Sequence, residues 1–246
     1  MAAALGLGLS TGDVVISLGT SGTVYAVSDH PIADPTGTVA GFADATGRFL
    51  PLVCTLNATK VIDAFARLLG LGYQAFDDLA LATPAGAGGV VLLPYLDGER
   101  TPNRPNATGV LSGLRSDVSR GQLARAAIEG VVCGLLDGLD ALLVAGVDCS
   151  GRLLLIGGGA RSKAFRQVVA DLAQRTVVVP EADEHVATGA ALQAAVVWKY
   201  GNGDPLAFDE LAQRWGLGNG VEVRPVASAD EAAAVRSAYA QSRDRS

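Results

Sequence analysis

Two glycine-bearing turns carry the residues that are best suited to chemistry in this sequence. One is the segment Gly-Gly-Gly-Ala-Arg-Ser at residues 157–162, which follows a short apolar run and precedes a helical pattern through Ala173. The first N–H groups of a helix have no partner within it and lie at the positive end of its dipole, and glycine lets a ligand approach the backbone. The pattern therefore predicts a strand, a tight turn and a helix that could hold a nucleotide or another anion. A plain strand-to-helix connection, which also favours glycine, is the alternative.

The second turn is Gly19-Thr20-Ser21-Gly22, which joins strand patterns at residues 13–18 and 23–27. It offers backbone N–H groups and two hydroxyls to one point, and phosphate oxygens accept from such donors without a Lys or Arg. Glycine, serine and threonine also populate ordinary hairpin turns, and the chemistry of this turn alone favours that interpretation.

A dinucleotide site is the local alternative at the first turn. Gly157, Gly159 and Ser162 nearly fit the dinucleotide fingerprint, and Glu181 follows the next strand pattern where a ribose-binding acid would lie. However, Ser162 replaces the third glycine, and the usual fingerprint opens its fold. An adenine nucleotide held between the two glycine turns fits the whole chain better, and NAD remains the alternative.

The charged residues outside these two turns are expected to have mainly structural roles. Asp97, Glu99 and Arg100 fall in the proline-rich loop at residues 94–105, where adjacent opposite charges are predicted to be solvated, although Glu99 and Arg100 could orient a polar substrate. Glu129 lies in an apolar helical pattern, where a carboxylate is costly unless it is paired.

The elements that must position these residues alternate along the chain. Periodicity and capping signals predict strands at residues 49–53 and 176–179, helices at residues 58–69 (closed by Gly70) and 187–200, and a long helix that starts at Ser119 with Gln122 in a capping box. Further caps are predicted at Asp183, at Asp204 with Pro205 as the first helical residue, and at Ser228 with Glu231. This order predicts a single α/β domain, a mixed sheet with helices packed on it.

Composition excludes several classes of function. The chain of 246 residues has a net charge of −6 and no basic cluster, so nucleic acid is not an expected partner. Its three cysteines form no CxxC pair and there are only two histidines, so no metal site is expected and a reducing, cytoplasmic location is predicted. No apolar run approaches the length of a membrane span, and no signal peptide is recognised.

Several segments, in the same order, resemble the FGGY carbohydrate kinases and, within that family, the xylulokinases. The similarity runs from about Ala2 to about Tyr200, and it is carried by residues 12–22, 93–102, 109–114, 122–129, 157–162 and 189–191. The resemblance implies an actin-like (ribonuclease-H-like) fold, with ATP and sugar bound between two such domains. Residues 1–246 would form the second, ATP-binding domain.

The resemblance also implies roles for individual residues. Gly19, Thr20 and Ser21 would meet the terminal phosphates, and Asn57 would approach the nucleotide from its helix. The adenosine would be bordered by Gly158, Gly159, Ala160, Ser162 and Lys163. ATP with Mg²⁺ would be the cofactor, and the full reaction would convert D-xylulose to xylulose 5-phosphate.

One departure from the family limits what this chain is expected to do alone. The family's general-base aspartate lies a few residues before an Ala-Ala-Leu-Gly run, which here is residues 3–6, so the base is expected just upstream of Met1 and no catalytic residue is expected in this chain. No Asp-x-Gly-Thr hairpin is present either. We therefore expect weak binding of adenine nucleotide without sugar phosphorylation by this chain alone, and self-association as a homodimer if its apolar face is exposed. A non-catalytic actin-like module that binds nucleotide or a partner is the alternative function.

Overall fold

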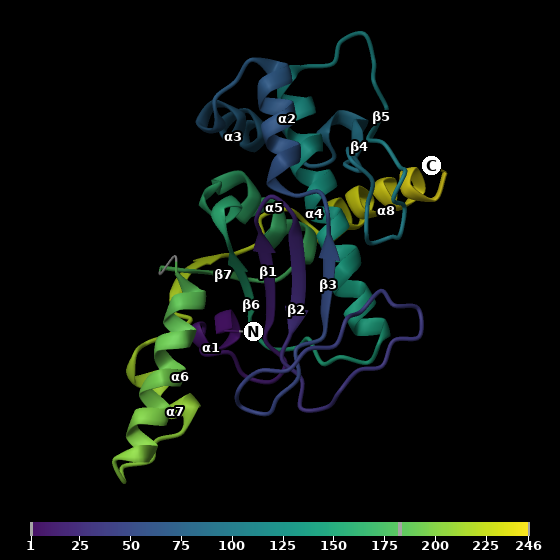
Figure 1. Ribbon diagram of the computed structural model, residues 1–246. Helices are drawn as coiled ribbons and strands as arrows, with labels where there is room; N and C mark the ends of the chain where they lie inside the picture. Colours follow the sequence, from purple (N-terminus) through teal and green to yellow (C-terminus); the bar gives the residue numbers. More distant parts are fainter. Residues whose placement is uncertain (1, 182–183, 246) are drawn as a thin grey trace.

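A six-stranded mixed sheet forms the centre of the computed structural model, which describes residues 2–181 and 184–245 (Figure 1). Its strands lie in the order β3-β2-β1-β6-β7-β8, where β1–β6 and β6–β7 are parallel pairs and the other neighbours are antiparallel. The strands are β1 Val14–Leu18, β2 Gly22–Ala26, β3 Leu52–Thr55, β6 Leu153–Ile156, β7 Val177–Pro180 and β8 Gly220–Val223. A separate antiparallel pair joins β4 Val91–Leu93 to β5 Val110–Ser112.

Helices pack on both faces of the six-stranded sheet. They are α1 Ala2–Gly6, α2 Thr59–Leu69, α3 Tyr73–Ala82, α4 Arg120–Val144, α5 Lys163–Ala173, α6 His185–Gly201, α7 Phe208–Arg214 and α8 Ala229–Arg245. Successive strand residues point to opposite faces, so β1 sends Ile16 into the main core with α4 and α5, and Val15 into a second core with Ala4 of α1. In Figure 1, α2 and α3 stand beyond the upper end of the sheet, while α6 and α7 extend away from its lower left.

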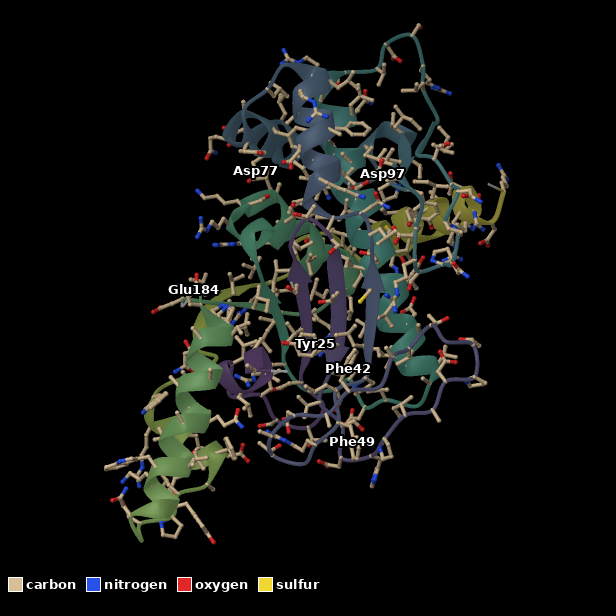
Figure 2. All side chains as sticks on the ribbon, in the orientation of Figure 1. Tyr25, Phe42, Phe49, Asp77, Asp97 and Glu184 are labelled. Atoms are coloured by element: carbon tan, nitrogen blue, oxygen red, sulfur yellow. The ribbon has the colours of Figure 1, made fainter. Side chains whose placement is uncertain are left out.

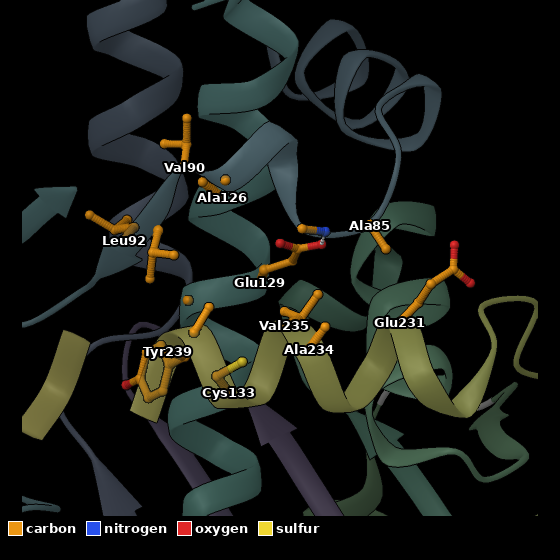
Figure 3. A pocket seen from close by; sticks show the side chains of 15 residues that line it. Ala85, Val90, Leu92, Ala126, Glu129, Cys133, Glu231, Ala234, Val235 and Tyr239 are labelled. Carbon is orange, nitrogen blue, oxygen red and sulfur yellow. Dashed lines mark hydrogen bonds between the residues drawn. The ribbon is translucent and has the colours of Figure 1, made fainter. Parts of the chain in front are cut away.

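The last helix, α8, lies across α4 and β4 and leaves a hollow of about 270 Å³ between them (Figure 3). Small residues such as Gly86, Gly130 and Ala234 line this hollow together with apolar side chains such as Val235.

The exposed face of α6 is largely apolar. Val186, Val197, Trp198 and Tyr200 are each more than 60% exposed. Such a face is what the expected self-association requires, and the association itself stays a prediction. Among the described residues, no helix is both long and apolar enough to cross a bilayer.

Most of the predicted elements are confirmed. The strands predicted at residues 13–18 and 23–27 are present as β1 and β2, and the helix predicted at residues 58–69 is present as α2. Gly70 ends that helix with a left-handed φ of 62°. The capping box of Ser119 and Gln122 begins α4. Ser228 and Glu231 exchange the same pair of bonds at the start of α8.

Two predicted elements need correction. The predicted cap at Asp204 and Pro205 is wrong, because α7 begins only at Phe208 and the Asp204 carboxylate pairs with Lys199 instead. The strand predicted at residues 49–53 is shifted to Leu52–Thr55, since Phe49 forms only isolated bridges.

Two expectations refer to residues that the structure does not describe. The predicted cap at Asp183 lies outside the described residues. Met1, just upstream of which the resemblance puts the general base, also lies outside them. Both stay predictions.

Candidate nucleotide site

The two glycine turns meet at one edge of the sheet. Strands β1 and β6 are parallel neighbours, with Ser17 opposite Ile156, so the turns that follow them leave the sheet side by side. Ligands of open α/β sheets are bound at the carboxyl ends of the parallel strands. The structure thus brings together two segments that are more than 130 residues apart in the sequence.

Close packing of the turns requires glycine at two positions. Gly157 has a φ of +89°, and a Cβ atom built on it would lie 2.6 Å from the Leu18 carbonyl oxygen. A Cβ atom on Gly159 would lie 2.7 Å from the Leu18 Cβ. Gly158, in contrast, is exposed and a Cβ atom there would meet nothing within 4 Å, so its backbone borders open space.

The first turn presents its hydroxyls outward and its carbonyls inward. Thr20 and Ser21 are exposed, and no hydrogen bond of their hydroxyls is found within residues 2–181 and 184–245. The carbonyl oxygens of Gly19 and Thr20 accept from the Thr59 and Ala58 N–H groups at 3.0 and 3.2 Å. The Gly19 N–H donates to the Ser21 carbonyl at 3.1 Å, so this one of the predicted backbone donors is already used.

The second turn is fixed by Ser162. Its hydroxyl accepts from the Phe165 N–H at 3.0 Å, which caps α5, and donates to Asp77 Oδ1 of α3 at 2.7 Å. Figure 2 shows Asp77 in the layer of helices beyond the strand ends. Of the residues expected beside adenosine, Gly158 and Lys163 are exposed, Ser162 is half-buried, and Gly159 and Ala160 are buried.

Asn57 and Glu99 join the start of α2 to the loop at residues 94–105. The Asn57 amide nitrogen donates to the Gly98 carbonyl oxygen at 2.7 Å and to Glu99 Oε2 at 2.8 Å. Asn57 is 2% exposed, and its Oδ1 has no partner among the described residues. In this geometry the Asn57 amide nitrogen is bonded to the loop. The approach of Asn57 to the nucleotide, which the family resemblance implies, stays a prediction.

The prediction of a solvated Glu99 is wrong. The side chain is 2% exposed, and its Oε1 accepts from the N–H groups of Leu56 at 2.6 Å and Arg100 at 2.7 Å. The loop folds back on itself through a bridge between Glu99 and Arg104, which turns the carboxylate inward. Arg100 and Asp97 are exposed as predicted, and Asp97 pairs with Lys60 of α2 at 3.0 Å.

The expectation that Glu129 must be paired is confirmed. Its Oε1 accepts from Arg125 Nε at 2.7 Å, one helical turn away, and from the Gly86 N–H at 2.9 Å (Figure 3). Burial raises the pKa of this carboxyl, against the opposing effect of Arg125. Cys133, one turn further along α4, is also buried, and burial raises the pKa of its thiol.

The Ala-Ala-Leu-Gly run that follows Met1 forms most of α1. Ala4, Leu5 and Gly6 of this helix are buried, and a Cβ atom on Gly6 would overlap the His185 carbonyl oxygen at the start of α6. The run is therefore a packing element, and it supplies no acid or base of its own. The position of the general base upstream of Met1 stays a prediction from the resemblance.

The donors at the two turns suit an anion better than a metal ion. Hydroxyl and N–H groups can bind phosphate oxygens, whereas Mg²⁺ prefers carboxylate and carbonyl oxygens. Among the described residues, no group of three or more His, Cys, Asp or Glu side chains is arranged to hold a metal ion.

Comparison with solved structures defines the class of the fold. The chain is similar to the xylulose kinase of Bifidobacterium adolescentis, with a TM-score of 0.83 and 44% identity over 98% of this chain and 46% of that one. It is similar to the xylulose kinase of Rhodospirillum rubrum with a TM-score of 0.84 and 28% identity, over 99% of this chain and 48% of that one. The fold is therefore that of the actin-like ATPases.

The family follows from the sequence comparison. The model of the FGGY family of carbohydrate kinases, C-terminal domain, matches residues 14–198, and the chain belongs to this family. A xylulose kinase of Streptomyces rubiginosus is 54% identical over 214 residues, which are 87% of this chain and 42% of that protein. The chain thus spans less than half the length of the curated relatives that it matches.

Proposed function

We propose that this chain is the nucleotide-binding part of an ATP-dependent sugar kinase whose substrate is D-xylulose. The observation that carries the proposal is the convergence of the Gly19–Ser21 and Gly157–Lys163 segments at the carboxyl ends of β1 and β6. Support for the sugar comes from the relatives, since the two Streptomyces proteins that are more than half identical to this chain are xylulose kinases.

In this proposal the first turn holds the phosphates. The exposed hydroxyls of Thr20 and Ser21 donate to the β- and γ-phosphate oxygens, and the turn keeps its shape because its carbonyls are bonded to α2. Phosphoryl transfer depends on positioning and on stabilisation of charge at the phosphates, so fixed donors lower the barrier. Carbohydrate kinases of this family use ATP, generally with Mg²⁺, and that ion supplies neutralisation of the phosphate charge when bound.

The second turn holds the adenosine in this proposal. Gly158 and Lys163 contact it, Gly159 and Ala160 form the wall behind, and Ser162 keeps α5 in place through its bonds to Phe165 and Asp77. Asn57 acts indirectly, by joining α2 to the loop.

The sugar is placed outside these two turns. We propose that the sugar and the base that deprotonates its hydroxyl belong to the part of the protein that corresponds to the remaining length of the relatives. The sugar oxygen then attacks the γ-phosphorus, the bond between that phosphorus and the bridging oxygen breaks, and the hydroxyl proton passes to the base. Residues 1–246 form one domain in this proposal.

Calorimetric titration with MgATP, and with NAD in parallel, tests the proposal. MgATP should bind and NAD should not, and the double variant Thr20→Ala, Ser21→Ala should weaken MgATP binding by about 10- to 100-fold, since bonds to charged oxygens are removed. Ser237→Ala, an exposed serine on α8, is the matched control and should leave binding unchanged.

The remaining outcomes distinguish the alternatives. Binding of NAD alone would support a dinucleotide site at Gly157 and contradict the proposal. If addition of a separately produced sugar-binding half of a relative restores no turnover although MgATP binds, the non-catalytic module becomes the better description.

A further inference from the structure

We infer that Glu99 is a positioning residue for the phosphate-binding turn, acting through the residues that lead into α2. The inference rests on the proposed function, because it gives the turn at Gly19–Ser21 a phosphate to bind. Nothing in the local sequence around Glu99 indicates such a role, since the residues that it holds are more than 40 positions away.

The carboxylate of Glu99 is held by three N–H donors. Oε1 accepts from the Leu56 and Arg100 N–H groups, and Oε2 accepts from the Asn57 amide nitrogen, all within 2.8 Å. Bonds to an ionised acceptor are stronger than bonds between neutral groups, so this buried carboxylate is a firm attachment point. Two of the three donors belong to the residues that lead into α2.

Four consecutive residues link this carboxylate to the turn. Leu56 and Asn57 donate to Glu99, while the next two residues, Ala58 and Thr59, donate their N–H groups to the carbonyls of Thr20 and Gly19. A shift at Leu56 or Asn57 is therefore passed directly to the two carbonyls that set the orientation of the turn.

The start of α2 lacks a local side-chain cap. Its N-cap residue, Ala58, has a φ of −131° and a ψ of −107°, outside the usual cap conformation, and offers no side-chain acceptor. Helices commonly satisfy their first N–H groups with a local Ser, Thr, Asp or Asn. Here the turn carbonyls take the N–H groups, and the negative charge of Glu99 just before the helix also suits its dipole.

The loop that carries Glu99 is itself braced by α8. The hydroxyls of Tyr95 and Tyr239 lie 3.4 Å apart in the core, and Arg104 donates to the Arg243 carbonyl oxygen at 3.0 Å. The loop is thus a fixed support, which is what a positioning residue needs.

Substitution of a residue that only stabilises the fold would change the affinities for all ligands equally or not at all. The test therefore compares the affinity for a ligand with phosphates, MgADP, with the affinity for adenosine, which has none. The variant Glu99→Gln keeps the size of the side chain. It replaces Oε2, which accepts from the Asn57 amide nitrogen, with an NH₂ group, so that two donors face each other. MgADP affinity, measured by calorimetry well below the unfolding temperature, should fall about tenfold, the equivalent of one bond to a charged group. Adenosine affinity should stay within about twofold, because the second turn is held by Asp77 and Phe165 instead.

Asp97→Asn is the matched control. Asp97 lies in the same loop and also contacts α2, through Lys60 at 3.0 Å, but its side chain is 75% exposed. This variant should leave both affinities within about twofold of the unsubstituted chain. A lower unfolding temperature for Glu99→Gln with unchanged MgADP affinity, or an equal loss for MgADP and adenosine, would overturn the inference.

Hydrogen exchange keeps this test separate from the proposed function. If the unsubstituted chain binds no nucleotide, the proposed function fails, yet the exchange rates of the Ala58 and Thr59 amides still report how firmly α2 holds the turn. Glu99→Gln should accelerate both amides at least tenfold relative to Asp97→Asn. Unchanged rates would overturn the role of Glu99 whatever the ligand result.

Discussion

Glu129 and Glu99 are both almost fully buried, at 4% and 2% exposure, but the fold satisfies their charges in different ways. Glu129 pairs with Arg125 on the same helix and with one N–H group of a nearby loop. Glu99 has three N–H donors, two of them from a segment more than 40 residues away. The first arrangement is built by helix geometry, whereas the second exists only when the loop and α2 are both in place.

Removal of the two carboxylates is expected to have different consequences. A buried ion pair leaves an uncompensated charge when one partner is removed, so its loss is expected to destabilise the whole domain. A carboxylate held by N–H donors leaves no opposite charge behind, and its loss is expected to act mainly on the segment that supplies the donors. Glu129 thus supports the core, and Glu99 supports the candidate site.

Glu129→Ala is expected to give the largest effect. It leaves Arg125, which is 4% exposed, without its ionic partner, and should lower the free energy of unfolding by about 3 to 5 kcal/mol. Urea unfolding measures this change. The double variant Arg125→Met, Glu129→Leu removes both charges and should recover most of the loss. A double variant no more stable than Glu129→Ala would contradict the ion-pair explanation.

Glu99→Ala is expected to have a smaller effect on stability. Three donors lose their acceptor, but Leu56 is 39% exposed, so water can reach that part of the chain. The free energy of unfolding should fall by about 1 to 3 kcal/mol in the same urea experiment. A loss as large as that of Glu129→Ala would remove the distinction between the two carboxylates.

The smallest expected effect is the pH dependence of the contribution of Glu129 to the free energy of unfolding. The pKa of Glu129 is raised in the folded protein above its ordinary value of 4.5, with burial as the largest cause. As pH rises from about 4.5 through the folded pKa, the unfolded state has released a proton that the folded state still binds, so this group's contribution to the free energy of unfolding falls.

Stability curves of the unsubstituted chain and Glu129→Gln measure that pH dependence. The difference in free energy of unfolding, unsubstituted minus variant, should decrease with rising pH by at most about 1.4 kcal/mol per pH unit. A difference that grows with pH would mean that Arg125, rather than burial, dominates the titration of Glu129.

Local patterns in the sequence determined most of the elements that frame the site. Gly70 ended a helix because it adopts a left-handed conformation at no steric cost, and Ser119 began one because its hydroxyl reaches Gln122 three residues later. The i,i+4 pair of Arg125 and Glu129 also lies within one helical turn. Signals of this kind span a few residues and can be recognised without knowledge of the fold.

Tertiary structure alone decided how the site is assembled. The convergence of Thr20 and Gly158 depends on β1 and β6 being parallel neighbours, and the burial of Glu99 depends on a loop folding back onto α2. The Asp204 cap failed for a more local reason, since its carboxylate pairs with Lys199 on the preceding helix and α7 begins only at Phe208. The sequence indicated that the two glycine turns could serve one ligand, but the contacts that join them and the contacts that bury Glu99 form only when the sheet and its covering helices pack together.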